Sequence, residues 1–340
     1  MTSKLLPKKI LILGNGGWGT AIAMLLHKKG YAVTLWGADA SYTDYLKEKR
    51  ENVKYLKGIS IPPEIHITSN ISHKEMDVNI IVVATPTPYL RSVLMKFKQF
   101  FVQGTPIVSV TKGIENDTLM KPSEIIANVW GDQPISLLLG PSHAEEVARG
   151  LPTTIVASSK DIALARTVQE IFTTDRFRVY TNPDMIGVEL GAAMKNVVAI
   201  AAGICDGLKF GDNSKAALIT RGLAEISRLG VVMGAQKNTF SGLTGLGDLI
   251  TTCISPYGRN RWVGEQIGKG KKLQEVLEKM EQIAEGVWTT KSVTALSNKL
   301  NVEMPITQEI YNVLFTNKDP LEAVSNLMMR TPRSEMEELA

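Results

Sequence analysis

The stretch ILILGNGGWGTAIAMLL, residues 10–26, joins a short apolar run to an amphipathic segment through a glycine-rich turn. Gly14, Gly16 and Gly19 fit the pattern Gly-x-Gly-x-x-Gly, which connects a buried strand to a helix where a pyrophosphate binds. The first glycine permits a tight turn, the second admits the phosphate, and the third lets helix and strand approach. Residues 32–36 form a second expected strand at suitable spacing. The stretch therefore predicts a dinucleotide-binding domain.

Further β-branched apolar runs continue through the first half of the chain. They cover residues 65–69, 80–84, 106–110, 137–139 and 154–157. These runs lack clean alternation, which is typical of strands that are buried on both faces in a parallel sheet covered by helices. The first half is therefore expected to be a doubly wound Rossmann-type sheet.

The sequence changes character after Asn182 and Pro183, where long stretches rich in alanine, leucine, glutamate and lysine replace the strand-like runs. Helices are expected over residues 184–203, 214–229, 249–253, 261–267, 273–280, 289–300, 306–315 and 321–329. The predicted fold class is α/β, with an all-helical second domain following the Rossmann-type sheet. The expected domains are a dinucleotide-binding domain, 1–183, and a substrate-binding and catalytic domain, 184–340.

Composition excludes several classes of protein. A chain of 340 residues is long enough for two domains, and 44% hydrophobic and 21% charged residues are ordinary globular values. The formal net charge is only +4, and no basic run alternates with aromatic residues, so no nucleic-acid partner is expected. Small anionic molecules are more plausible ligands.

The apolar stretch 185–205 is long enough to suggest a membrane span. Glu189, Lys195 and several glycines interrupt it, so no membrane insertion is expected and a buried core helix is predicted. Cys205 and Cys253 have no close pairing motif, which indicates two free thiols and a reducing, cytoplasmic setting.

Lys195 and Asp248 are the first candidates for chemistry. Lys195 is flanked by apolar residues, and burial would bring its pKa towards neutrality, so that it could donate or accept a proton. The alternative is a lysine whose stem crosses the helix surface and whose ammonium reaches solvent. Asp248 ends the run Gly245-Leu-Gly-Asp248 at the start of a helix, where it could cap that helix or orient an ammonium group.

Other polar residues stand where ligands commonly bind. Lys112 and Ser142 each follow an expected strand, and the carboxyl edge of a parallel sheet is the usual ligand site. The run Gly258-Arg-Asn-Arg261 opens a helix with backbone donors and a guanidinium, which suits a phosphate, although a solvated arginine is the alternative. The four histidines lack ligand spacing, so no metal site is expected, and Ser142 lacks the Gly-x-Ser-x-Gly setting of a hydrolase.

Six motifs in order resemble those of the bacterial type of NAD(P)-dependent glycerol-3-phosphate dehydrogenases. They are Gly14–Thr20, Val110–Gly113, Gly140–Glu145, Gly191–Asn196, Gly245–Asp248 and Gly258–Arg261. The resemblance runs from about Lys9 to the segment 302–315. It implies a cytoplasmic, homodimeric oxidoreductase that reversibly reduces dihydroxyacetone phosphate to sn-glycerol 3-phosphate for phospholipid synthesis, with NAD or NADP as cofactor.

The same resemblance implies roles for individual residues. Lys195 is the expected catalytic proton donor and acceptor. The implied substrate-binding residues are Lys112, Gly140, Ser142, Lys195, Asp248, Gly258, Arg259 and Asn260. The implied cofactor-binding residues are Gly14, Gly16, Gly17, Trp18, Gly19, Ala38, Lys112, Ala144, Arg259, Ile283 and Glu285.

Two positions depart from the common pattern of that family. Ala38 stands where relatives often carry an arginine or histidine that meets a ribose phosphate, whereas Asp39 could accept from an unphosphorylated ribose. Dual use of NAD and NADP is therefore expected. Gly258 stands where a serine is frequent, which removes a hydroxyl group but keeps a backbone donor.

Two alternatives remain open at this level. A β-hydroxyacid dehydrogenase shares the glycine turn and a helix-borne lysine but binds a carboxylate instead of a phosphate ester. A nonenzymatic redox sensor would bind the dinucleotide to alter a partner contact, and the presence of Lys195 with Asp248 counts against it.

Overall fold

The computed structural model describes residues 9–280 and 283–335 and divides into two compact units. The first unit takes in the described residues up to Thr111 together with Pro122–Met185, and the second takes in Lys112–Lys121 and the chain from Ile186 onward. Residues 112–121 were expected in the first domain, whereas their contacts group this segment with the second unit. Residues 1–8, 281–282 and 336–340 of the predicted domains lie outside the described residues.

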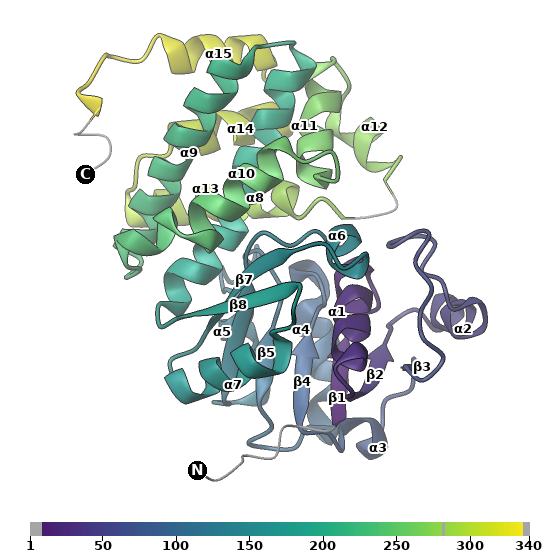
Figure 1. Cartoon of the computed structure of the whole chain (residues 1–340). Helices are drawn as coiled ribbons and strands as arrows, with labels where there is room; N and C mark the ends of the chain where they lie inside the picture. The colour runs from purple at the N-terminus through teal and green to yellow at the C-terminus, as the bar shows by residue number, and fades with distance from the viewer. Residues whose placement is uncertain (1–8, 281–282, 336–340) are drawn as a thin grey trace. The chain divides into compact units, whose positions relative to one another are not determined.

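The first unit is built on one sheet of eight strands in the order β3-β2-β1-β4-β5-β6-β7-β8. The strands are β1 (Lys9–Leu13), β2 (Ala32–Trp36), β3 (His66–Thr68), β4 (Ile80–Val83), β5 (Ile107–Ser109), β6 (Ile135–Leu139), β7 (Thr153–Ser158) and β8 (Phe177–Asn182). The central strand β1 pairs in parallel with β2 on one side and β4 on the other (Figure 1). This arrangement confirms the expected Rossmann-type sheet.

Burial of β1 on both faces explains why its sequence is uniformly apolar. Ile10 and Ile12 pack in a cluster with Ile22 of a covering helix, whereas Leu11 and Leu13 lie outside that cluster although they are just as buried. Successive side chains of a strand point to opposite faces, so both faces of β1 are covered. The helices of this unit are α1 (Gly17–Lys28), α2 (Ala40–Lys49), α3 (His73–Met76), α4 (Thr87–Phe97), η1 (Lys98–Phe100), α5 (Pro122–Trp130), α6 (Ala144–Ala148) and α7 (Ile162–Phe172).

Two features of the sheet differ from the sequence prediction. Strand β7 runs antiparallel to β6, so the sheet is parallel only on either side of that junction. Strand β8 was not predicted, because this edge strand alternates buried Phe177 and Val179 with exposed Arg178 and Tyr180. Such half-buried alternation belongs to an edge, and the prediction relied on continuous apolar runs.

The second unit is helical in all of its described part apart from turns and loops (Figure 1). Its helices are α8 (Met185–Gly207), α9 (Asp212–Val232), η2 (Lys237–Ser241), η3 (Leu243–Gly247), α10 (Asp248–Ile254), α11 (Arg259–Gly268), α12 (Leu273–Leu277), α13 (Glu285–Leu300), α14 (Pro305–Phe315) and α15 (Pro320–Met328). Each expected helix is present within a few residues of its predicted ends. The short turns η2 and η3 were not predicted, since segments of five residues carry no helical period.

Helix α8 is the apolar helix that could have been read as a membrane span. Its most apolar window of 18 residues is entirely buried inside the protein, which is the behaviour of a core helix. Gly203 of α8 and Gly264 of α11 allow this packing, because a Cβ at either position would collide with a backbone carbonyl of the other helix. The prediction of a buried core helix is confirmed.

Candidate active site

The glycine turn between β1 and α1 has the geometry of an anion site. Gly14 adopts a φ of +126°, and a Cβ there would lie 2.6 Å from the carbonyl oxygen of Ala84. A Cβ on Gly19 would collide with the carbonyl oxygen of Gly14, so the helix approaches the strand as closely as the pattern requires. Gly16 precedes the helix in an extended conformation and has nothing within 4 Å of its Cβ position.

The first turn of α1 carries no acidic residue, and the N-cap residue Gly16 offers no capping side chain. The backbone N–H groups of this turn can therefore donate to an anion, and the helix dipole favours negative charge there. Gly17 lies against the carbonyl of Tyr55, and the half-buried ring of Trp18 packs towards Phe177 at a centroid distance of 6.5 Å. The turn fits a dinucleotide pyrophosphate.

The end of β2 is the expected ribose side of the dinucleotide site. Ala38 is exposed and offers no charge. Asp39 is the N-cap of α2, where its carboxylate accepts a hydrogen bond of 3.0 Å from the N–H of Tyr42. A carboxylate in this position can accept a hydrogen bond from the hydroxyl of an unphosphorylated ribose.

Gly140, Ser142 and Ala144 lie where the sequence analysis placed them, just beyond the carboxyl end of β6. The hydroxyl of Ser142 donates to the carbonyl of Gly140 over 3.0 Å, which shapes the turn. Ala144 begins the short helix α6.

A cluster of buried charges forms in the second unit. Lys195 lies near the middle of α8, and its ammonium donates to Asp248 Oδ1 and to the hydroxyl of Thr252. The other carboxylate oxygen of Asp248 accepts from Lys112 Nζ at 2.8 Å. Only 7% of the Lys195 side chain and 2% of the Asp248 side chain are exposed. The alternative of a Lys195 ammonium in solvent is therefore wrong.

Asp248 begins α10, and its carboxylate is engaged by the two lysines rather than by the backbone of that helix. Of the two roles open to it, capping and orienting an ammonium group, the structure supports the second. Thr252 was missed by the sequence analysis. It lies four residues after Asp248 on the same face of α10, and this spacing could have revealed it.

The charged groups in the cluster shift one another's pKa values. Burial is the main cause that lowers the pKa of Lys195 to about 8, while Asp248 opposes this effect and Lys112 adds to it. Burial alone would raise the pKa of Asp248, but the two ammonium groups outweigh it and lower that pKa. A lysine with a pKa near neutrality can both donate and accept a proton, which is the requirement for general acid and base catalysis.

A second group of predicted residues gathers where α11 and α13 begin. Arg259 is exposed and donates through Nη1 to the carbonyl of Ile283 over 3.0 Å. The side-chain oxygen of Asn260 accepts from the N–H of Gly286 over 2.9 Å, so Asn260 caps α13. Gly258 precedes α11 without a capping side chain.

These helix ends lie beside the Lys195 segment of α8. A Cβ on Gly286 would lie 2.6 Å from the carbonyl oxygen of Asn196, the residue after Lys195. Burial raises the pKa of Glu285, and the positive charges of Arg259, Lys112 and Lys195 counteract that rise. The second unit thus combines a guanidinium, a helix N-terminus and two lysines, which suits a substrate that carries a phosphate.

A glycine turn shaped for a pyrophosphate and a buried lysine held by a carboxylate define the class of this protein. It is a Rossmann-type oxidoreductase that uses a pyridine dinucleotide.

The chain belongs to the NAD-dependent glycerol-3-phosphate dehydrogenase family. The family's N-terminal model matches residues 9–165, and its C-terminal model matches residues 184–325. A glycerol-3-phosphate dehydrogenase [NAD(P)+] of Chlorobium phaeobacteroides is 49% identical over 331 residues, which cover 96% of this chain and 99% of the relative. The corresponding protein of Bacillus pumilus is 49% identical over 335 residues, covering 98% and 97%.

The crystal structure of glycerol-3-phosphate dehydrogenase from Coxiella burnetii is similar throughout. Its TM-score is 0.92 at 37% sequence identity, and the match covers 96% of this chain and 100% of that chain. The similarity therefore extends over both units.

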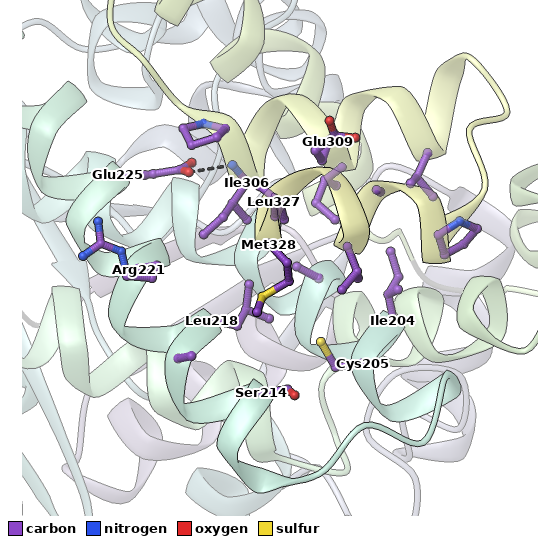
Figure 2. Close-up of a pocket in the computed structure, with 18 of the residues that line it drawn as sticks. Ile204, Cys205, Ser214, Leu218, Arg221, Glu225, Ile306, Glu309, Leu327 and Met328 are labelled. Carbon is purple, nitrogen blue, oxygen red and sulfur yellow. Dashed lines mark hydrogen bonds between the residues drawn. The ribbon is translucent and has the colours of Figure 1, made fainter. Parts of the chain in front are cut away.

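An apolar cavity of about 250 Å³ lies elsewhere in the second unit, among residues of α8, α9, α14 and α15 (Figure 2). None of the predicted site residues lines it. Glu225 stands at its edge and accepts hydrogen bonds from the N–H groups of Ile306 and Thr307, at 2.6 and 3.1 Å. Glu225 thus caps α14, although burial raises its pKa to about 7.

The buried Glu225 carboxyl predicts a pH dependence of stability. Its pKa is about 7 in the folded chain against an ordinary value of 4.5, so its contribution favours folding below pH 4.5 and is lost as the pH rises through 7. Between about pH 5 and pH 8, the free energy of unfolding should fall by about 2 to 3 kcal/mol from this group.

Urea unfolding of the wild type and of the Glu225→Gln variant at both pH values measures this contribution as a difference. Glu322→Gln, on the exposed face of α15, is the matched control and should follow the wild type. Equal pH dependence in the wild type and the Glu225→Gln variant would contradict the prediction.

Proposed function

We propose that this chain catalyses the reversible, NAD(P)-dependent reduction of dihydroxyacetone phosphate to sn-glycerol 3-phosphate. The observation that carries the proposal is the buried Lys195 ammonium, held by Asp248 and Thr252 and kept near neutral pKa. The names of the relatives and the family membership support the same reaction.

Lys195 moves the proton. The bound dinucleotide supplies or accepts the hydride at the central carbon of the substrate. In reduction, the Lys195 ammonium donates its proton to the oxygen on that carbon, and in oxidation the neutral amine removes it. Asp248 and Thr252 fix the position of the lysine nitrogen. Lys112 donates to the second carboxylate oxygen of Asp248 and so holds that carboxylate in place.

The phosphate group is assigned to the N-terminal end of α11. Arg259 supplies a guanidinium there, and the first turn of α11 contains no acidic residue. Backbone donors and a planar cation together favour a phosphate ester over an uncharged group. Asn260, Gly140 and Ser142 are proposed to complete the substrate pocket.

The proposed dinucleotide site comprises the glycine turn with Trp18, and Ala38, Lys112, Ala144, Arg259, Ile283 and Glu285. Residues 1–183 are assigned to dinucleotide binding and residues 184–340 to substrate binding and catalysis, with Lys112 serving both. Exposed, uncharged Ala38 supports use of both NAD and NADP. A cytoplasmic homodimer that supplies phospholipid synthesis is proposed as the setting.

Steady-state assays test the proposed reaction. Loss of absorbance from NADH or NADPH on addition of dihydroxyacetone phosphate is the expected result. A β-hydroxyacid with the oxidised dinucleotide serves as the comparison and should give no turnover, because a carboxylate replaces the phosphate ester. Activity only on the hydroxyacid would overturn the proposal, and tight dinucleotide binding without any turnover would favour a redox sensor.

A further inference from the structure

Asn52 lies just beyond α2 in the first unit, and its side chain is entirely buried. Its amide nitrogen donates to the carbonyl oxygen of Asn15 at 2.9 Å and to the hydroxyl of Thr20 at 2.8 Å. Its amide oxygen accepts from the hydroxyl of Tyr42 at 2.7 Å. A buried polar side chain that makes three hydrogen bonds holds its partners firmly, because leaving a buried donor or acceptor unpaired costs free energy.

The Asn15 carbonyl belongs to the glycine turn, between Gly14 and Gly16. The carbonyl of Asn15 and the N–H of Gly16 share one planar trans peptide unit, so they point in opposite directions. When Asn52 holds that carbonyl towards the protein interior, the N–H of Gly16 must point the other way. The bond to Asn52 therefore sets the direction of a backbone donor in the proposed anion site.

A parallel link ties the same turn to the start of α2. The side-chain nitrogen of Asn15 donates to the hydroxyl of Thr43 at 3.1 Å, and that hydroxyl donates to the carbonyl of Asp39 at 2.6 Å. Tyr42 adds a third connection, because its hydroxyl also accepts from the N–H of Lys54 at 3.1 Å. The glycine turn and the expected ribose side are thus joined by side chains that lie beneath them.

We propose that Asn52 is a positioning residue for the dinucleotide. It orients the glycine turn towards the pyrophosphate without touching the ligand, and so it acts on dinucleotide affinity rather than on proton transfer. The proposal rests on the proposed use of NAD(P) by this chain. Since NADH and NADPH share the pyrophosphate, loss of Asn52 should weaken both to the same extent.

Asn52→Ala is the direct test. The Kd of NADH, NADPH and ADP-ribose, measured by calorimetry on the full chain, should each rise about tenfold. The KM for dihydroxyacetone phosphate and the kcat, both at saturating dinucleotide, should stay within about twofold, since Lys195 and its partners are unchanged. Loss of a merely structural residue would lower stability without raising the dinucleotide Kd values while KM and kcat stay unchanged.

Tyr42→Phe is the matched control. It removes the hydroxyl on the other side of the Asn52 amide and leaves the contact with Asn15 in place, so each Kd should rise by less than about threefold. Unchanged Kd values in a folded Asn52→Ala variant would overturn the proposal. Equal losses in the Tyr42→Phe and Asn52→Ala variants would do the same.

Asn52→Asp provides a second route if the alanine variant does not fold. It keeps the size and the acceptor for Tyr42 but places a carboxylate oxygen against the Asn15 carbonyl, so the Kd values should rise at least as much, and unchanged values overturn the proposal. Failure of the proposed reaction would be recognised separately, because wild-type protein would bind ADP-ribose and yet not reduce dihydroxyacetone phosphate.

Discussion

Replacement of Lys195 by alanine is expected to lower kcat by about 10³-fold, which lies within the usual contribution of general acid and base catalysis. The substitution removes the ammonium group that is proposed to give its proton to the substrate oxygen, while the glycine turn of the first unit is untouched. Initial rates of dihydroxyacetone phosphate reduction measure the loss, and calorimetry should show a dinucleotide Kd within about threefold of the wild type.

Lys195→Arg is the matched control, because it keeps a positive charge beside Asp248 but cannot release its proton at ordinary pH. It should remain nearly inactive, whereas a rate near that of the wild type in either variant would refute the assignment.

The Lys195 pKa of about 8 also predicts a different pH profile for each direction of the reaction. Reduction needs the charged lysine and should decline above about pH 8, while oxidation needs the neutral amine and should decline below it.

Replacement of Asp248 by asparagine is expected to have the largest effect on stability. The carboxylate is buried between Lys112 and Lys195, and the substitution removes the negative charge that both ammonium groups contact. Breaking a buried ion pair in this way costs about 3 to 5 kcal/mol, which urea unfolding would measure. Loss of the carboxylate should also lower the pKa of Lys195, so that the alkaline decline of the reduction rate moves to lower pH.

Thr252→Val provides the control for Asp248, because it removes one uncharged partner of the same ammonium group. It should cost about 1 kcal/mol and leave the pH profile of the reduction rate close to that of the wild type. An Asp248→Asn variant as stable as the wild type, or one with an unshifted pH profile, would show that the carboxylate does not control Lys195.

Much of the first unit could be predicted because its signals are local. Strand β1, the turn at Gly14 and helix α1 are adjacent in sequence, and each imposes its own pattern of apolar or glycine residues. Strand β8 escaped prediction because an edge strand keeps only one apolar face. The antiparallel direction of β7 could not be predicted from its own residues either, since the direction of a strand depends on how the chain crosses the sheet.

The candidate residues of the site could be named from the sequence, but which of them contact one another could not. Lys195 stood out because an ammonium among apolar neighbours is unusual, yet its partner Asp248 lies 53 positions later in the chain. Lys112 is 136 positions from Asp248, and its grouping with the second unit follows from tertiary contacts alone. Asn260 was assigned to the substrate pocket, and its helix-capping bond to Gly286 became visible only in the structure.

The contact between Gly203 and α11 has a consequence for the choice of substrate. A Cβ on Gly203 would collide with a backbone carbonyl of α11, so α8 and α11 pack in direct backbone contact, and close packing of this kind transmits strain instead of yielding to it. Helix α8 carries Lys195, the proposed proton donor, and α11 carries Arg259, the proposed phosphate ligand. We therefore expect the separation between the Lys195 nitrogen and the Arg259 guanidinium to be fixed. A fixed separation should select the carbon-chain length of the substrate, so that longer phosphorylated ketones are rejected for their length and not for their polarity.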